Sequence, residues 1–230
     1  MPDAYCNPSQ AVRSDEIGLS KRQCVFNPQT SKYDCDENIP SVKQMVDRMR
    51  DKDDQGTADA EHSVVFYTNL GTEHKVSEQW IFGWLKKEGL EDKYYYLRTV
   101  INEKWYVAQA LHILENMGEP HNIENFSNCY CQALSVAAVH PIAYLFTTKG
   151  AKWREDSTWS VVEYPYLTQN PNIKEIWRVD PRPPSIKGIS EEEACNHDRP
   201  ELLWSRERGD KVLEPKWTCP YIYPEGGEFT

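Results

Sequence analysis

The chain has 230 residues and carries 36 Asp and Glu against 26 Lys and Arg, a formal net charge of -10. This length allows one substantial core, or two lobes that share a cleft. The negative charge argues against binding to nucleic acid or to anionic membranes, because both require concentrated positive charge. It does not exclude a nucleotide substrate, whose phosphate a single Arg or Lys can meet.

The first 40 residues are polar and rich in turn residues, so we predict an irregular, cysteine-bearing arm held by a disulfide. Residues 41–230 are predicted to form a single two-lobed domain. Ser41 is suited to cap a helix. The buried face of that helix is predicted from apolar residues at helical spacing, namely Val42, Met45, Val46 and Met49.

Residues 63–68 (Ser-Val-Val-Phe-Tyr-Thr) predict a strand that ends in a turn at 69–71. Two helices are predicted next. One has Trp80 and Trp84 on its buried face, and the other lies over residues 105–117. Between them, residues 94–97 fit either a helix or a strand.

In the second half, a helix rich in small residues is predicted over 127–139, and strands are predicted over 142–146, 158–163 and 175–179. A helix near 200–207 and an extended tail follow a proline-rich break. This alternation predicts an α/β (α+β) fold. We expect a helical N-terminal lobe, a C-terminal lobe with a partly parallel sheet, and a ligand cleft between them.

The predicted strand over 158–163 is the most informative segment, because it carries an acid to its end. Val161 and Val162 favour a pleated, partly buried surface. A carboxylate held beside such packing, here Glu163, can stabilise a developing positive charge. The ordinary alternative is a strand-end glutamate that faces water.

Seven cysteines are spread along the chain, at positions 6, 24, 35, 129, 131, 195 and 219. They form no paired CxxC or HxxxH pattern, so no zinc site is predicted. Their number and wide spacing favour disulfides made in an oxidising compartment, although the odd count leaves one thiol unpaired or intermolecular. Cys129 and Cys131 are too close on a helix to bond each other.

The sequon Asn125-Phe126-Ser127 predicts N-glycosylation at Asn125 and agrees with a secreted protein. No signal peptide and no transmembrane run is recognised, so we expect a mature or engineered N-terminus and no membrane span. A cytosolic protein with reduced thiols is the alternative.

Four segments together resemble, in order, the ADP-ribosyl cyclase family of NAD glycohydrolases and cyclases. They are Phe-Tyr-Thr-Asn at 66–69, Gly-Leu-Glu-Asp at 89–92, the stretch from Phe126 to Leu145, and Ser-Thr-Trp-Ser-Val-Val-Glu at 157–163. The resemblance covers about residues 63–223. The tail is similar to the family's final disulfide region, which implies a bond between Cys195 and Cys219.

The resemblance implies that Glu163 is the catalytic residue. Cleavage of the nicotinamide–ribose bond creates an oxocarbenium-like cation, which a rigid carboxylate stabilises. Glu91 would contact the nicotinamide carboxamide, Tyr67 and Phe126 would stack on the substrate, and Thr158 would meet the phosphate or ribose. The remaining candidate substrate contacts are Thr68, Asn69, Ser127 and Trp159.

These features together predict a secreted, disulfide-bonded enzyme that releases nicotinamide from NAD or NADP. The ADP-ribosyl group would pass to water, or to its own adenine to give cyclic ADP-ribose. NAD is the substrate, so no cofactor and no metal is expected, and a homodimer is left open. The alternative is a catalytically inactive member of the same fold that serves as a secreted binding or host-interaction protein. Asn69 and Tyr67 favour this alternative, since the family has at the position of Asn69 an arginine that meets the pyrophosphate. The retention of Thr158 and Glu163 opposes it.

Overall fold

The computed structural model describes residues 25–27, 29, 32–34, 39–71, 74–95, 99–117, 120–150, 152–183 and 197–221. Its main sheet has the strand order β4-β3-β5-β6-β7. The parallel strands are β3 (Ser63–Thr68), β4 (Tyr94–Tyr95), β5 (Ile142–Thr147) and β6 (Glu175–Val179). At one edge, β7 (Glu201–Ser205) pairs antiparallel with β6.

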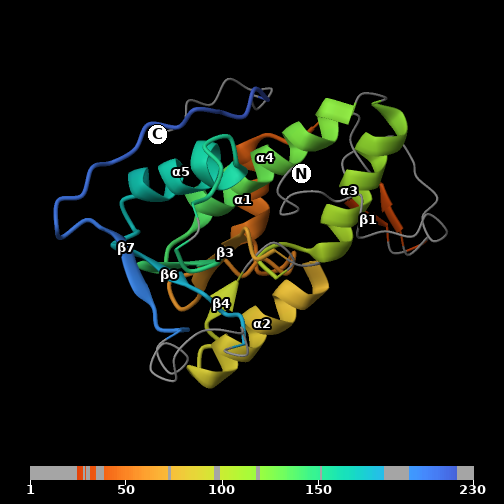
Figure 1. Cartoon of the computed structure of the whole chain (residues 1–230). Helices are drawn as coiled ribbons and strands as arrows, with labels where there is room; N and C mark the ends of the chain where they lie inside the picture. The colour runs from red at the N-terminus through yellow and green to blue at the C-terminus, as the bar shows by residue number, and fades with distance from the viewer. Residues whose placement is uncertain are drawn as a thin grey trace.

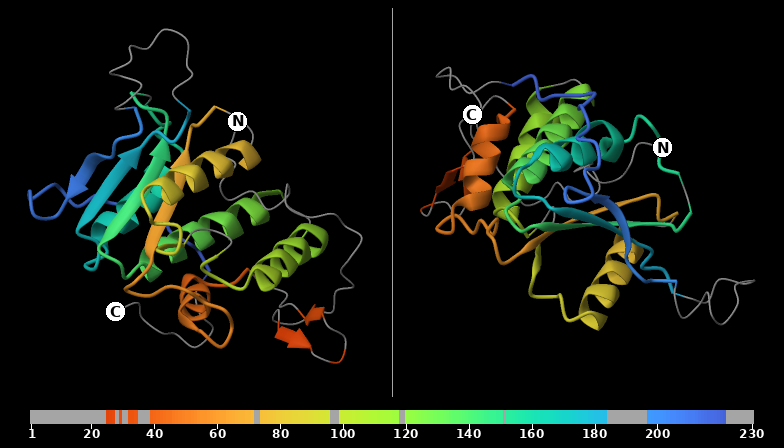
Figure 2. Two further views of the ribbon diagram at one scale, coloured as in Figure 1. Left: turned by 90° about the horizontal axis from the view of Figure 1, so that it is seen from below. Right: turned by 90° about the vertical axis from the view of Figure 1, so that its left-hand side faces the viewer.

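Helices cover both faces of this sheet (Figure 1). One face carries α2 (His74–Lys87), and the other carries α4 (Pro120–Ala137) and α5 (Tyr164–Gln169), as the right-hand view of Figure 2 shows. Two further helices, α1 (Val42–Arg50) and α3 (Glu103–Asn116), pack against α4. The predicted α/β class with a partly parallel sheet is therefore confirmed.

The sheet joins the two halves of the chain, because β3 lies between β4 and β5. All six residues of β3 are buried, as expected for a central strand of a parallel sheet. Val64 and Phe66 belong to the core on the α4 side, whereas Val65 and Tyr67 belong to the core beneath α2. Side-chain alternation along one strand thus builds both cores.

Most of the predicted helices are confirmed. Ser41 caps α1 in a capping box, in which Gln44 N donates to Ser41 Oγ and Ser41 N donates to Gln44 Oε1. Asn102 caps α3 by accepting from the N–H groups of Lys104 and Trp105. Residues 94–95 of the ambiguous segment form the short strand β4.

The strand prediction for residues 158–163 is wrong. The segment forms a wide π-helical turn, η3 (Trp159–Glu163), which continues into α5. Ser157 starts the turn: its Oγ accepts from Ser160 N, and its carbonyl accepts from Val161 N. The β preference of Val161 and Val162 is overridden, because their turn packs against α4.

The helix prediction near 200–207 is also wrong, since β7 occupies this segment. Leu202 lies opposite Trp177 and Glu201 lies opposite Arg178 in an antiparallel ladder. Trp204 is buried in the main core, so packing on the sheet edge decides the conformation.

Only part of the predicted N-terminal arm is described. Its strands β1 (Val25–Asn27) and β2 (Lys32–Asp34) pair antiparallel, which is more regular than the irregular arm expected. Cys6, Cys24 and Cys35 lie outside the described residues, so the disulfide predicted to hold the arm does too.

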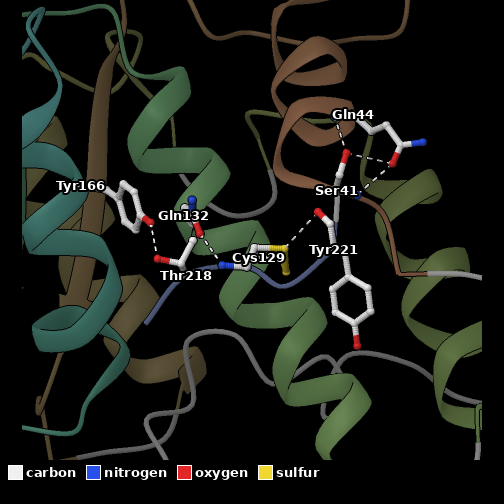
Figure 3. Close-up of a disulfide and its surroundings, with 8 residues drawn as sticks. Ser41, Gln44, Cys129, Gln132, Tyr166, Thr218 and Tyr221 are labelled. Atoms are coloured by element: carbon white, nitrogen blue, oxygen red, sulfur yellow. Dashed lines mark hydrogen bonds between the residues drawn. A yellow bond between two sulfur atoms is a disulfide. The ribbon is translucent and has the colours of Figure 1, made fainter. Parts of the chain in front are cut away.

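A disulfide is confirmed, but the pairing of Cys195 with Cys219 is wrong: Cys219 bonds Cys129 of α4 (Figure 3). The tail crosses α4 at this point, and Gln132, one turn along the helix, accepts from Cys219 N at 2.8 Å. Cys131 is also disulfide-bonded, to a cysteine outside the described residues, where Cys195 lies as well.

Gly56 gives a test of the packing after α1. A Cβ placed there would lie 2.5 Å from the Met49 carbonyl oxygen and closer still to that of Arg48. Backbone atoms cannot yield cheaply, so we expect Gly56→Ala to lower the free energy of unfolding by about 1–3 kcal/mol. Urea denaturation measures this change.

Gly83 is the matched control, because a Cβ at this position in α2 meets nothing within 4 Å. Gly83→Ala should stabilise the protein by about 1 kcal/mol through helix propensity. Equal effects of the two substitutions would contradict this account of Gly56.

Candidate functional site

The candidate site lies where the parallel strands β3 and β5 end. Doubly wound sheets bind ligands outside the carboxyl ends of their strands, at the point where the chain reverses its direction across the sheet. Here the chain passes from β3 to β4 on one side and later to β5 on the other, so this point lies between β3 and β5.

Two threonines mark this position. Thr68 and Thr147 are paired at the ends of β3 and β5, with exposed fractions of 2% and 0%. Thr68 and Thr147 lie two residues after Phe66 and Leu145 on their strands. Because side chains two residues apart share a face, both threonines point to the α4 side of the sheet. Thr147 Oγ1 has no hydrogen-bond partner in the described structure. Thr68 was predicted from the sequence, whereas Thr147 was not, although the polar end of the second predicted strand could have indicated it.

Helix α4 and turn η3 bring further predicted residues to this side. The Trp159 ring lies 5.7 Å from the Phe66 ring, and Thr158 Oγ1 donates to Asn128 Oδ1 at 3.1 Å. The neighbour of Asn128 on α4 is Ser127. Its buried Oγ and the Trp159 Nε1 both lack a hydrogen-bond partner among the described residues. Three predicted substrate contacts, Ser127, Thr158 and Trp159, therefore belong to adjoining elements.

Glu163 ends η3 and is nearly enclosed, with an exposed fraction of 3%. One turn earlier on the same segment, Trp159 packs on Phe66 and stacks on Tyr164, with ring centroids 5.1 Å apart. Val162, the residue before Glu163, is fully buried. The carboxylate is therefore carried by a turn fixed on both sides by apolar packing, as required of a charge-stabilising group.

The two predicted stacking residues do not come together. Tyr67 belongs to the core beneath α2, and Phe126 to the core on the opposite face. Phe126 is itself fully buried and stacks on Tyr106, with ring centroids 5.2 Å apart. Both rings are core aromatics in this structure.

Glu91 lies toward the opposite end of the strands from the site, whereas Asn69 directly follows Thr68 at the end of β3. Glu91 is exposed and precedes β4, whose first residue pairs with Ser63, about 16 Å along β3 from Thr68. Asn69 is an exposed turn residue with a φ of 54°, a left-handed conformation that asparagine tolerates. The sequon residue Asn125 is half-buried within α4.

A buried carboxylate that the sequence analysis missed organises the loops at this edge of the sheet. Asp180, directly after β6, accepts from Lys149 N at 2.6 Å and from Arg182 Nε at 2.8 Å. His197 Nε2 lies 3.3 Å from its Oδ1. The sequence signal that could have indicated this carboxylate is an Asp two residues before an Arg at the end of a predicted strand. Asp180 thereby ties the loops after β5 and β6 together.

The hydrogen bonds of Asp180 decide its protonation. Burial alone disfavours its charged form, but hydrogen bonds from the Arg182 side chain and from the N–H groups of Lys149 and Arg182 outweigh that effect. The pKa of Asp180 is consequently held below its usual value.

Comparisons of the chain with protein-family models, with curated proteins and with solved structures found no match. Among the described residues, no group of three or more His, Cys, Asp or Glu could hold a metal ion. None of the helices in the described ranges is long and apolar enough to cross a membrane.

Replacing Asp180 tests its role in stability. Above about pH 4, the ordinary titration range of Asp, the wild type has the full contribution of the ionised carboxylate, and it loses this as the pH falls through the lowered pKa. Asp180→Asn should cost about 2–3 kcal/mol at pH 7, and the difference should shrink on acidification. Urea unfolding at several pH values measures this.

Asp156 supplies the control, because its ion pair with Arg154 is exposed on both sides. Asp156→Asn should leave stability unchanged within error. A pH-independent difference between wild type and Asp180→Asn would refute the assigned role of the Asp180 charge.

Proposed function

We propose that this protein cleaves the nicotinamide–ribose bond of NAD or NADP and that Glu163 stabilises the ribosyl cation. The observation that carries the proposal is a nearly buried carboxylate on a π-helical turn whose Trp159 packs on Phe66 of β3. Irregular π turns inside helices occur frequently at functional sites. The resemblance of residues 157–163 to the catalytic segment of the ADP-ribosyl cyclase family supports the same residue.

The chemistry needs little more than this group. As the bond breaks, nicotinamide leaves with the bonding electron pair and the ribose carbon becomes cationic. A preorganised carboxylate in a poorly solvated setting stabilises that charge strongly. Water, which gives up one proton to the solvent, or the substrate's own adenine then attacks the same carbon, giving ADP-ribose or cyclic ADP-ribose.

The buried hydroxyls suit the polar part of the substrate. Ser127 Oγ and Thr147 Oγ1 lack partners in the described structure, and Thr158 donates to Asn128, the neighbour of Ser127 on α4. Such groups can donate to ribose or phosphate oxygens. Because Glu163 has an exposed fraction of only 3%, side chains that cover it must move when the substrate enters.

A secreted enzyme is part of this proposal. Both cysteines of α4 are disulfide-bonded. Cys129 bonds Cys219, and Cys131 bonds a cysteine outside the described residues. Disulfides of this kind form in oxidising compartments.

The second candidate is a catalytically inactive protein of the same fold with a binding role outside the cell. The enclosure of Glu163, the burial of Tyr67 and Phe126 in separate cores, and the position of Glu91 favour it. The two candidates differ in whether NAD is consumed.

Incubation with NAD and with NADP, followed by chromatography of nicotinamide, tests the proposal. We expect release by the wild type and a loss of about a hundredfold or more in Glu163→Gln, because the charge that stabilises the cation is removed. Product analysis then separates ADP-ribose from its cyclic form.

Glu124→Gln is the matched control, since Glu124 is an exposed carboxylate on α4. It should release nicotinamide at the wild-type rate. Absence of release by the wild type, or equal rates in Glu163→Gln and wild type, would reject the proposed activity and favour the binding protein.

A further inference from the structure

Pro165 leaves a gap in the hydrogen bonding of the segment that carries Glu163. In an α-helix the carbonyl of Val161 would accept from the N–H of residue 165. Proline has no N–H, and its ring collides with the carbonyl four residues earlier. This collision accounts for the widening of η3 immediately before α5.

The C-terminal segment closes this gap. Val161 O accepts from Lys216 N at 3.1 Å and from Trp217 N at 3.3 Å. We refer to residues 213–219 as the C-terminal strap. Two backbone donors from a segment more than 50 residues away in sequence therefore meet the one carbonyl that Pro165 deprives of its helical donor.

The strap is anchored along its whole length. Leu213 N donates to Thr168 Oγ1 at 2.9 Å, at the end of α5. Tyr166 Oη lies 2.9 Å from Thr218 Oγ1, and the disulfide of Cys219 fixes the far end to α4 (Figure 3). The strap thus crosses α5, η3 and α4 in turn.

The strap and Glu163 lie on different sides of the same turn. Val161 is partly exposed and meets the strap, whereas Glu163, two residues on, is enclosed. Two residues span roughly half of a π turn, whose hydrogen bonds join residues five apart. The strap therefore holds the outer side of the turn whose inner side carries the carboxylate.

We propose that the C-terminal strap is a positioning element for Glu163: its N–H groups replace the helical donor that Pro165 removes, and the Cys129–Cys219 disulfide keeps it in place. The catalytic consequence rests on the proposed function. The structural part, which concerns the conformation of η3, can be tested without any activity.

The Trp159–Tyr164 ring stack reports on η3. The two residues are five positions apart, and their rings are stacked at an interplanar angle of 14°. On a regular α-helix, residues five apart point about 140° away from each other. The near-ultraviolet circular dichroism of the stacked rings should therefore change if the turn relaxes to α geometry.

Lys216→Pro removes one strap donor, and Lys216→Ala is its matched control because it keeps the backbone N–H while changing the same exposed side chain. Hydrogen exchange of residues 160–167, read by mass spectrometry, should accelerate about tenfold or more in Lys216→Pro and stay unchanged in Lys216→Ala. The Cys129→Ser/Cys219→Ser double variant, which frees the end of the strap, should give the same acceleration. Peptides from β3 and β5 serve as the internal standard of a folded core.

Pro165→Ala provides the rescue. Alanine supplies the missing N–H, so in the Lys216→Pro background it should return protection to residues 160–167 while altering the dichroism of the Trp159–Tyr164 stack. If Lys216→Pro lowered protection for a reason unrelated to the Val161 carbonyl, Pro165→Ala would not restore that protection. Failure of the rescue, or unchanged exchange in both strap variants, would overturn the proposal.

Nicotinamide release separates the two proposals. If the wild type is active, Lys216→Pro should lower kcat, because the carboxylate that stabilises the cation is displaced; a rise in KM as well would report movement of Thr158 and Trp159 on the same turn. If the wild type releases no nicotinamide, but exchange accelerates in Lys216→Pro and is restored by Pro165→Ala, the strap proposal stands and the proposed activity is rejected. If the strap variants release nicotinamide and their hydrogen exchange is unchanged, the proposed activity stands and the strap proposal is rejected.

Discussion

The parallel pairing of β3 with β5 holds the first and second halves of the chain in one sheet. Every residue of β3 is buried, and its alternate side chains enter the two cores on opposite faces. The α2 side holds Tyr67 and Trp84, and the α4 side holds Phe66 and Trp159. Because α4, η3 and α5 are seated on this strand pair, the position of Glu163 depends on it.

A second constraint acts within the helical layer. Pro165 prevents a regular helix around Glu163, and the tail supplies hydrogen bonds that the proline cannot. The result is a wide turn held from outside by the C-terminal strap and from inside by the Phe66, Trp159 and Tyr164 rings. A local irregularity in the sequence is thus stabilised by residues from the far end of the chain.

The structure divides the candidate residues into two groups. Thr68, Ser127, Thr158, Trp159 and Glu163 belong to adjoining elements on the α4 side of the sheet, and Thr147 joins them. Tyr67, Phe126 and Glu91 are placed as core or surface residues. The proposed chemistry therefore depends on a carboxylate and buried hydroxyls rather than on aromatic walls.

Local patterns in the sequence determined the strand over 63–68, the capped helix after Ser41 and the α/β class, because these depend on side-chain alternation and capping within a few residues. They failed at 158–163, where valines favour a strand in isolation. There the start at Ser157, the break at Pro165 and packing on α4 together impose a helical turn.

Contacts between distant segments were decided only by the tertiary structure. The partner of Cys219 depends on where the tail crosses α4, and the edge strand β7 depends on pairing with β6. Sequence by itself determined that residue 163 is a carboxylate beside two valines, and the fold decided that it faces the interior, because burial is a property of packed elements and not of local order.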